Sequence, residues 1–102
     1  IKMKIKFVRK WAYPLFFSKV PVYVNGEVIA KVKNKGKFDY EGPARTIKLH
    51  GPGVVRNIEF DLETDKHDLV IEFKIAMGVF AGGFLVKILC NGEEVQKIRK
   101  TF

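Results

Sequence analysis

The chain has 102 residues, a formal net charge of +8 and a single cysteine. This length suits one domain spanning residues 1–102 and excludes a multidomain protein. One cysteine excludes an internal disulfide and a multi-cysteine metal site. The 37 β-branched and aromatic residues outnumber the 14 Ala, Leu, Met and Gln residues, which favours strands over helices.

The N-terminus carries the clearest strand pattern. Residues 1–7 alternate apolar side chains with lysines, which predicts a half-buried strand with a lysine face. Asn25-Gly26 then separates two apolar runs, and this dipeptide is typical of the type I′ turn that closes a tight hairpin. Further strands are expected, in chain order, at 20–24, 27–32, 38–41, 46–50, 58–63, 69–75 and 84–90.

The C-terminal segment has two interpretations. Asn91-Gly92 repeats the earlier Asn25-Gly26 and predicts a second hairpin. Alternatively, Asn91 as an N-cap with Glu94 three residues later would begin a short helix. We expect the hairpin, because a helix of under three turns is marginal. The whole pattern predicts an all-β fold, a single antiparallel β-sandwich of seven or eight short strands, with a small β-barrel as the alternative.

Two segments resemble a known class of module. The run from Val22 to Val32, VYVNGEVIAKV, and the later ARTIKL from Ala44 to Leu49 are similar to the hairpin and returning strand of bacterial PEGA-like, Ig-like β-sandwich modules. The resemblance covers residues 20–50. It implies an accessory or interaction module, often attached to larger surface or membrane proteins, with no catalytic residues to carry over.

Charge is segregated along the chain. Residues 1–37 hold ten Lys or Arg and one acid, Glu27, whereas residues 59–72 hold six acids. Strands of opposite charge pair favourably within one sheet, so part of this segregation is expected to be internal. The net positive field still attracts anionic partners.

The sequence offers little for catalysis. The candidate nucleophiles and bases are Ser18, His50, His67 and Cys90. Their spacing matches neither a nucleophile–base arrangement nor a metal signature, and the carboxylates at 59–63 are interpreted as a solvated face. We therefore expect no enzyme activity, catalytic residue, metal site, cofactor or small-molecule substrate.

The candidate binding segment runs from residue 9 to residue 19. It joins positive charge to a cluster of aromatic side chains, and its proposed partner-binding residues are Arg9, Lys10, Trp11, Tyr13, Phe16, Phe17 and Lys19. The aromatics could plug an open end of the sandwich, dock a protein partner, or contact a membrane surface or other anionic partner. We expect a non-catalytic interaction module with a protein partner.

The alternative function is binding of nucleic acid or an anionic membrane surface through lysine-rich strands. Its proposed residues are Lys2, Lys4, Lys6, Lys31, Lys33, Lys35 and Lys37, supported by the basic run Lys97, Arg99 and Lys100. Strand 1–7 lacks exposed aromatics beside its lysines, unlike an RNA-reading sheet, and lysines also discourage edge pairing.

The sequence leaves localisation open. No secretory signal is readable at the N-terminus, and the longest uncharged run, 75–86, is too short to span a bilayer as a helix. Because the chain begins with Ile1, we expect either an excised domain of a longer protein or a native start at Met3. The expected location is cytoplasmic, or membrane-tethered for an excised domain.

Overall fold

The computed structural model describes residues 2–11, 18–51, 55–64, 66–77 and 82–99, and its regular elements are all strands. There are nine of them: β1 (Met3–Arg9), β2 (Val20–Val24), β3 (Glu27–Val32), β4 (Lys37–Gly42), β5 (Thr46–Leu49), β6 (Ile58–Asp61), β7 (Asp68–Met77), β8 (Gly82–Cys90) and β9 (Glu93–Arg99). The all-β prediction is confirmed, although seven or eight strands were expected.

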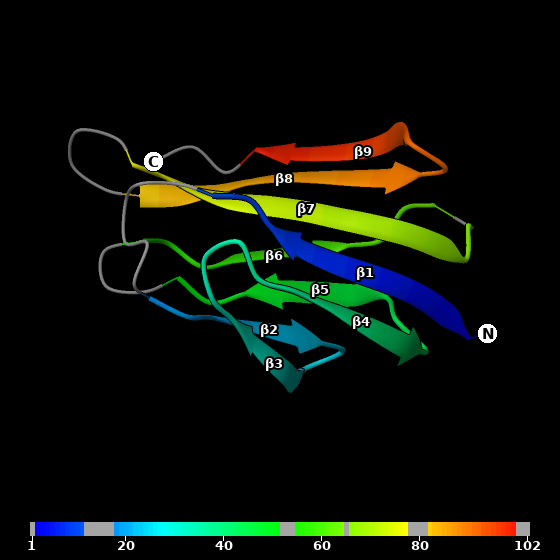
Figure 1. Ribbon diagram of the computed structural model, residues 1–102. Coiled ribbons are helices and arrows are strands. Elements are labelled where there is room, and N and C mark those ends of the chain that lie inside the picture. The colour runs from blue at the N-terminus through cyan, green and yellow to red at the C-terminus, as the bar shows by residue number, and fades with distance from the viewer. Residues whose placement is uncertain (1, 12–17, 52–54, 65, 78–81, 100–102) are drawn as a thin grey trace.

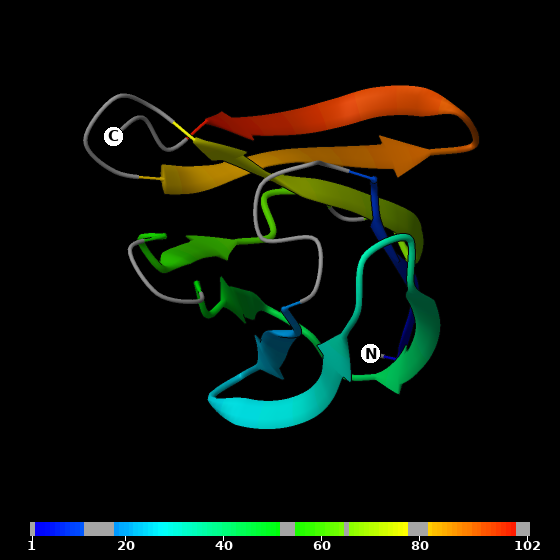
Figure 2. The ribbon, with the colours of Figure 1, turned by 60° about the vertical axis from the view of Figure 1, so that its left-hand side comes forward.

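The strands form two sheets. One has five strands in the order β4-β1-β7-β8-β9, and the other has four in the order β3-β2-β5-β6. Figure 1 shows the strands of both sheets running along the long axis of the molecule, and Figure 2 shows the five-stranded sheet arching over the four-stranded one. The described strands do not close into a barrel.

One strand pair corrects the antiparallel prediction. β1 and β7 pair in parallel, with Ile5 beside Leu69 and Phe7 beside Ile71. Parallel neighbours need a long crossover connection, and here the chain builds all of β2 to β6 between the two strands. Each strand pattern is local, so it carries no information about this long-range pairing.

Both Asn-Gly dipeptides form the predicted tight turns. Asn25 and Gly26 have φ values of 52° and 87°, and Asn91 and Gly92 have 53° and 82°. Two successive positive φ values are what a type I′ turn requires, and asparagine and glycine adopt them at least cost. The second turn joins β8 to β9, so the hairpin prediction is confirmed over the short helix.

A single hydrophobic core lies between the two sheets. Alternate residues of each strand point into it, as in β1, where Ile5 and Phe7 are buried between exposed lysines. Phe7 also stacks on Phe38 of β4, with ring centroids 4.8 Å apart. Both sheets therefore contribute residues to the core, and the remaining residues of each strand point outward to the surface.

Two long polar side chains connect the sheets. Arg9, at the end of β1, donates from its Nη1 to the carbonyls of Ser18 (2.6 Å) and Val32 (2.9 Å). Gln96 of β9 donates from Nε2 to the Asp61 carbonyl (3.0 Å) and accepts at Oε1 from the Glu63 amide (3.1 Å). Each side chain satisfies backbone groups of segments outside its own sheet.

Candidate functional site

The first residue of the proposed partner-binding segment is not at the surface. Arg9 has the same strand parity as Ile5 and Phe7, and its side chain is only 1% exposed. It is the only buried charged residue within the described part of the chain. Burial lowers the pKa of the Arg9 guanidinium from its usual value. Arg9 is therefore corrected from a partner-binding residue to an internal one.

The next two residues of that segment are exposed. Trp11 is 57% exposed, and Lys10 reaches Glu72 of β7 with its Nζ 3.4 Å from the carboxylate. Lys19 is exposed too, but it lies just before β2, which belongs to the other sheet. The remaining members of the predicted set, Tyr13, Phe16 and Phe17, lie outside the described residues.

Trp11 borders a depression of about 410 Å3 over β7, β8 and β9. We call its outward-facing members the tryptophan surface, which consists of Lys10, Trp11, Lys74, Leu85, Lys87 and Lys97. Glu72 is the one carboxylate that lines it. The structure thus adds lysines from three strands to the predicted Lys10 and Trp11.

Strand register explains why these lysines meet. Lys87 lies opposite Glu72 of β7 on one side and opposite Lys97 of β9 on the other. Lys74 lies opposite Leu85, two residues further along each strand, where side chains again point outward. Lysines placed directly opposite each other repel, so the Lys87–Lys97 pair favours a bound anion.

The lysine face of β1 has a different electrostatic environment. Lys2 forms an ion pair with Glu41 of β4, with Nζ and Oε1 3.1 Å apart, and this hydrogen bond lowers the pKa of Glu41. Lys4 lies between Glu41 and Asp68 in register. Lys6 lies opposite Asp39. This part of the predicted anion-binding set is interleaved with carboxylates.

The rest of that set gathers around the turn between β3 and β4. A second depression, of about 280 Å3, is lined by Lys31 and Lys33 from one side of the turn, Lys37 from the other, and Lys19 from the start of β2. We call these four residues the lysine depression. Lys35 is exposed within the turn itself, with a positive φ of 63°. The structure therefore unites Lys19, predicted for one function, with lysines predicted for the other.

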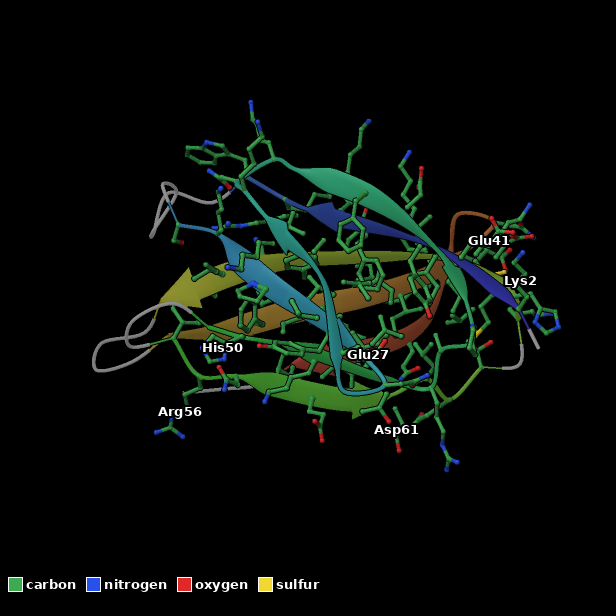
Figure 3. The ribbon with its side chains drawn as sticks, turned by 90° about the horizontal axis from the view of Figure 1, so that it is seen from below. Lys2, Glu27, Glu41, His50, Arg56 and Asp61 are labelled. Atoms are coloured by element: carbon green, nitrogen blue, oxygen red, sulfur yellow. The ribbon has the colours of Figure 1, made fainter. Side chains whose placement is uncertain are left out.

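The ion pair of Lys2 with Glu41 lies far from Arg56. Figure 3 places the paired Lys2 and Glu41 at one end and Arg56 and His50 at the opposite end. A third depression, near Lys2, is lined by both lysines and acids. The tryptophan surface lies over β7, β8 and β9, and the lysine depression lies around the turn from β3 to β4.

The residues considered for catalysis are scattered. The Ser18 carbonyl accepts from Arg9, the His50 amide donates to the Pro21 carbonyl, and the His67 carbonyl accepts from the Lys4 amide. Cys90 is a half-buried free thiol at the end of β8. Within the described ranges, no group of three His, Cys, Asp or Glu side chains could hold a metal ion. We derive no reaction step from them.

Sequence reasoning missed Lys74 and Lys87 as binding residues and named Lys97 only within a C-terminal basic run. Each of the first two is a single lysine between buried apolar neighbours, which is the ordinary pattern of a solvated strand face. Their significance depends on strand order, which the local sequence does not encode.

Within the described residues, no helix has the length and apolarity needed to cross a membrane.

Comparison with known proteins finds no relative of this chain. No family model, curated protein or solved structure matches it.

Proposed function

We propose that this chain is a non-catalytic interaction module, built as a β-sandwich, that docks an acidic protein partner through the tryptophan surface. The PEGA-like resemblance of residues 20–50 implies the same kind of module and is retained as part of the proposal. The observation that carries it is the position of Trp11, a large exposed aromatic framed by lysines from β7, β8 and β9.

The aromatic component supplies binding energy. Among the described residues, the large apolar side chains with high exposure are Trp11, Val28 and Val95. Tryptophan is enriched among the few interface residues that dominate protein–protein affinity, because it removes a large apolar area from water and loses little rotamer entropy. An exposed tryptophan and half-buried Leu85, which line the same depression, therefore form an apolar centre for a contact.

The charged component selects the partner. Four lysines and one carboxylate leave the tryptophan surface with a positive excess. A complementary acidic surface accelerates encounter and excludes basic competitors, whereas it adds less to affinity than the apolar centre does. The partner is therefore expected to present carboxylates around an apolar side chain.

The lining of the surface argues against a small-molecule ligand. Small-molecule sites are mostly apolar, with few polar groups. This depression is lined by four lysines and one carboxylate, so it suits a charged macromolecular surface better.

The sole tryptophan of the chain reports on the site directly. We expect red-shifted Trp11 emission that acrylamide quenches readily, because the side chain is exposed. Titration with a peptide of alternating glutamate and leucine should shift the emission to the blue, and a glutamine-leucine peptide should not. Replacing Lys87 and Lys97 with glutamine should weaken this response at least tenfold, whereas replacing Lys4 and Lys6 should leave it unchanged.

Several outcomes would overturn the proposal. Blue-shifted, poorly quenched Trp11 emission in the free protein would make the tryptophan part of the core. An equal loss in both double variants would show that only net charge matters. A stronger emission response to anionic vesicles or to an oligonucleotide than to the acidic peptide would assign the surface to one of those partners.

A further inference from the structure

The lysine depression is a second basic feature that docking at the tryptophan surface does not use. Its charged members come from two separate segments: Lys19 before β2, and Lys31, Lys33 and Lys37 around the β3–β4 turn. No carboxylate lines it, in contrast to the tryptophan surface with Glu72. The two depressions share no lining residue, so each can be altered without the other.

None of the four lysines has an anionic partner within the described part of the chain. The ion pairs seen there belong to Lys2 with Glu41 and Lys10 with Glu72. Ammonium groups held close together repel one another, and only solvent or a bound anion offsets that repulsion. The depression therefore presents concentrated positive charge that the fold itself leaves uncompensated.

Hydrogen bonds from the buried Arg9 hold the backbone that carries these lysines. The buried Arg9 side chain binds the carbonyls of Ser18 and Val32, the residues next to Lys19 and Lys33. The Arg9 amide donates to the Gly36 carbonyl at 2.8 Å. A single buried guanidinium residue thus ties both halves of the depression together, which limits the entropy lost when a ligand binds.

The turn itself is closed by short-range contacts. The Gly36 amide donates to the Lys33 carbonyl at 2.7 Å. A Cβ at Gly36 would lie 2.7 Å from that same carbonyl oxygen, so the tight turn leaves no room for a side chain there. Phe38, which also lines the depression, is held by its stack on Phe7.

The number of separate charges favours a ligand with several anionic groups. Lys31 and Lys33 are exposed on either side of the buried Val32, so they lie on the same side of the chain, about 7 Å apart along it. Lys37 and Lys19 add two further ammonium groups to the lining. Four separate cations match a series of phosphates better than a single anion.

The chemistry of the lining favours phosphate over bases. Lysine ammonium groups bind phosphate oxygens as point charges and read no sequence. The one aromatic residue in the lining, Phe38, already stacks on Phe7, so it is not a free platform for a base. Recognition would therefore be confined to the backbone of the polymer.

The lining residues favour a nucleic acid strand over a membrane. Peripheral membrane binding requires apolar side chains that protrude into the interface, and the depression has none among its lining residues. A positively charged groove that follows a backbone is the usual arrangement for single-stranded nucleic acid.

From these observations, we propose that the lysine depression binds the phosphodiester backbone of a single-stranded nucleic acid, independently of base sequence and of the tryptophan surface. The ligand spans Lys31, Lys33 and Lys37 and reaches Lys19. This site makes the chain a two-site module, with one face for an acidic protein and a separate groove for a nucleic acid strand.

The salt dependence follows from the number of phosphates neutralised. For single strands, the logarithm of the association constant falls with the logarithm of salt concentration with a slope of about −0.7 per contact. Four lysine contacts give a slope of about −3, so affinity should fall about 50-fold between 50 and 200 mM salt. Removing two of the lysines should halve the slope.

The test uses the anisotropy of a fluorescent oligothymidylate of about 20 nucleotides, titrated with the whole chain at several salt concentrations. Replacing Lys31 and Lys33 with glutamine should weaken binding at least tenfold at low salt and reduce the slope to about −1.4. The matched control replaces Lys4 and Lys6 with glutamine, which removes the same net charge at the carboxylate-rich end of β1. Its slope should stay near −3. Urea unfolding of both variants checks that each is fully folded under the conditions of the titration.

Three results would overturn the inference. Equal losses in the two double variants would reduce the effect to net charge. A slope unchanged by loss of Lys31 and Lys33 would move the site elsewhere. Binding of phosphatidylserine vesicles, but not of oligothymidylate, through the same lysines would replace the nucleic acid with a membrane. Replacing Lys87 and Lys97 with glutamine should leave oligothymidylate affinity within about twofold while weakening the acidic-peptide response at least tenfold, so the two proposals fail separately.

Discussion

Replacing Arg9 is the sharpest test of how the fold supports its basic end. The guanidinium binds the buried carbonyl of Val32 at 2.9 Å and the part-buried carbonyl of Ser18 at 2.6 Å. Arg9→Met keeps an unbranched apolar side chain, two atoms shorter than arginine, and removes the donors. The two carbonyl groups then lose these partners at positions with limited access to water.

The size of the effect follows from these contacts. A buried carbonyl left without its donor costs about 2 kcal/mol, and a part-buried one about 1 kcal/mol. Relief of the guanidinium desolvation, which lowers the pKa of Arg9, opposes this loss. We therefore expect Arg9→Met to lower the free energy of unfolding by about 2 to 3 kcal/mol. Arg9→Ala should cost about 2 kcal/mol more, because the γ-methylene, the sulfur and the ε-methyl group that methionine keeps also leave the core.

Urea unfolding followed by circular dichroism measures both variants, and the slope with urea shows whether unfolding remains two-state. Hydrogen exchange supplies a second readout, because the amide of Lys33 should exchange faster in Arg9→Met once the adjoining carbonyl of Val32 is released. A loss below about 0.5 kcal/mol would refute the reasoning, since the two hydrogen bonds would then contribute nothing beyond their desolvation cost.

Three further predictions concern the rest of the fold. Gly51→Ala should lower the free energy of unfolding by at least about 2 kcal/mol in urea, because its Cβ would lie 2.2 Å from the Val55 carbonyl oxygen; an unchanged midpoint would contradict this packing. Gln96→Ala should cost about 1 kcal/mol and speed exchange of the Glu63 amide, which donates to its side chain; unaltered exchange would show that this link between the sheets is not maintained. Lys2 lowers the pKa of Glu41, so the stability from this carboxylate is present above its unfolded pKa and is lost as pH falls through the folded one. Glu41→Gln should therefore melt below the parent chain at pH 7, with a difference that shrinks below about pH 4; a constant difference would assign the effect to something other than ionisation.

The elements that depend on neighbouring residues could be predicted from the sequence. Asn25-Gly26 and Asn91-Gly92 both adopt positive φ values, because an Asn-Gly pair meets the steric demand of a type I′ turn wherever it occurs between strands. The parallel pairing of β1 with β7 could not be predicted in this way. This pairing joins residues more than sixty positions apart. No local sequence pattern indicates which strands become neighbours in a sheet.

The burial of Arg9 could have been predicted from the alternation of buried and exposed residues in β1. Met3, Ile5 and Phe7 alternate with lysines, and continuing the alternation places Arg9 on the buried side of β1. The positive charge favoured the opposite interpretation, since charged side chains are almost never fully buried without partners. Here the partners are backbone carbonyls, which the sequence gives no means of identifying.

The candidate sites follow from how the two sheets distribute charge, rather than from where lysines cluster along the chain. The most regular lysine series, that of β1, lies beside carboxylates: Lys4 is flanked by Glu41 and Asp68. Opposite charges on adjacent strands stabilise the sheet. The carboxylates also reduce the positive potential of these lysines, so they attract an anionic ligand only weakly. Lys87, in contrast, has Lys97 as one of its neighbours, and the lysine depression has no carboxylate in its lining. Because carboxylates flank the β1 lysines and none lines the lysine depression, reversing a lysine of β1 should disturb folding more than binding, and reversing Lys31 should do the opposite.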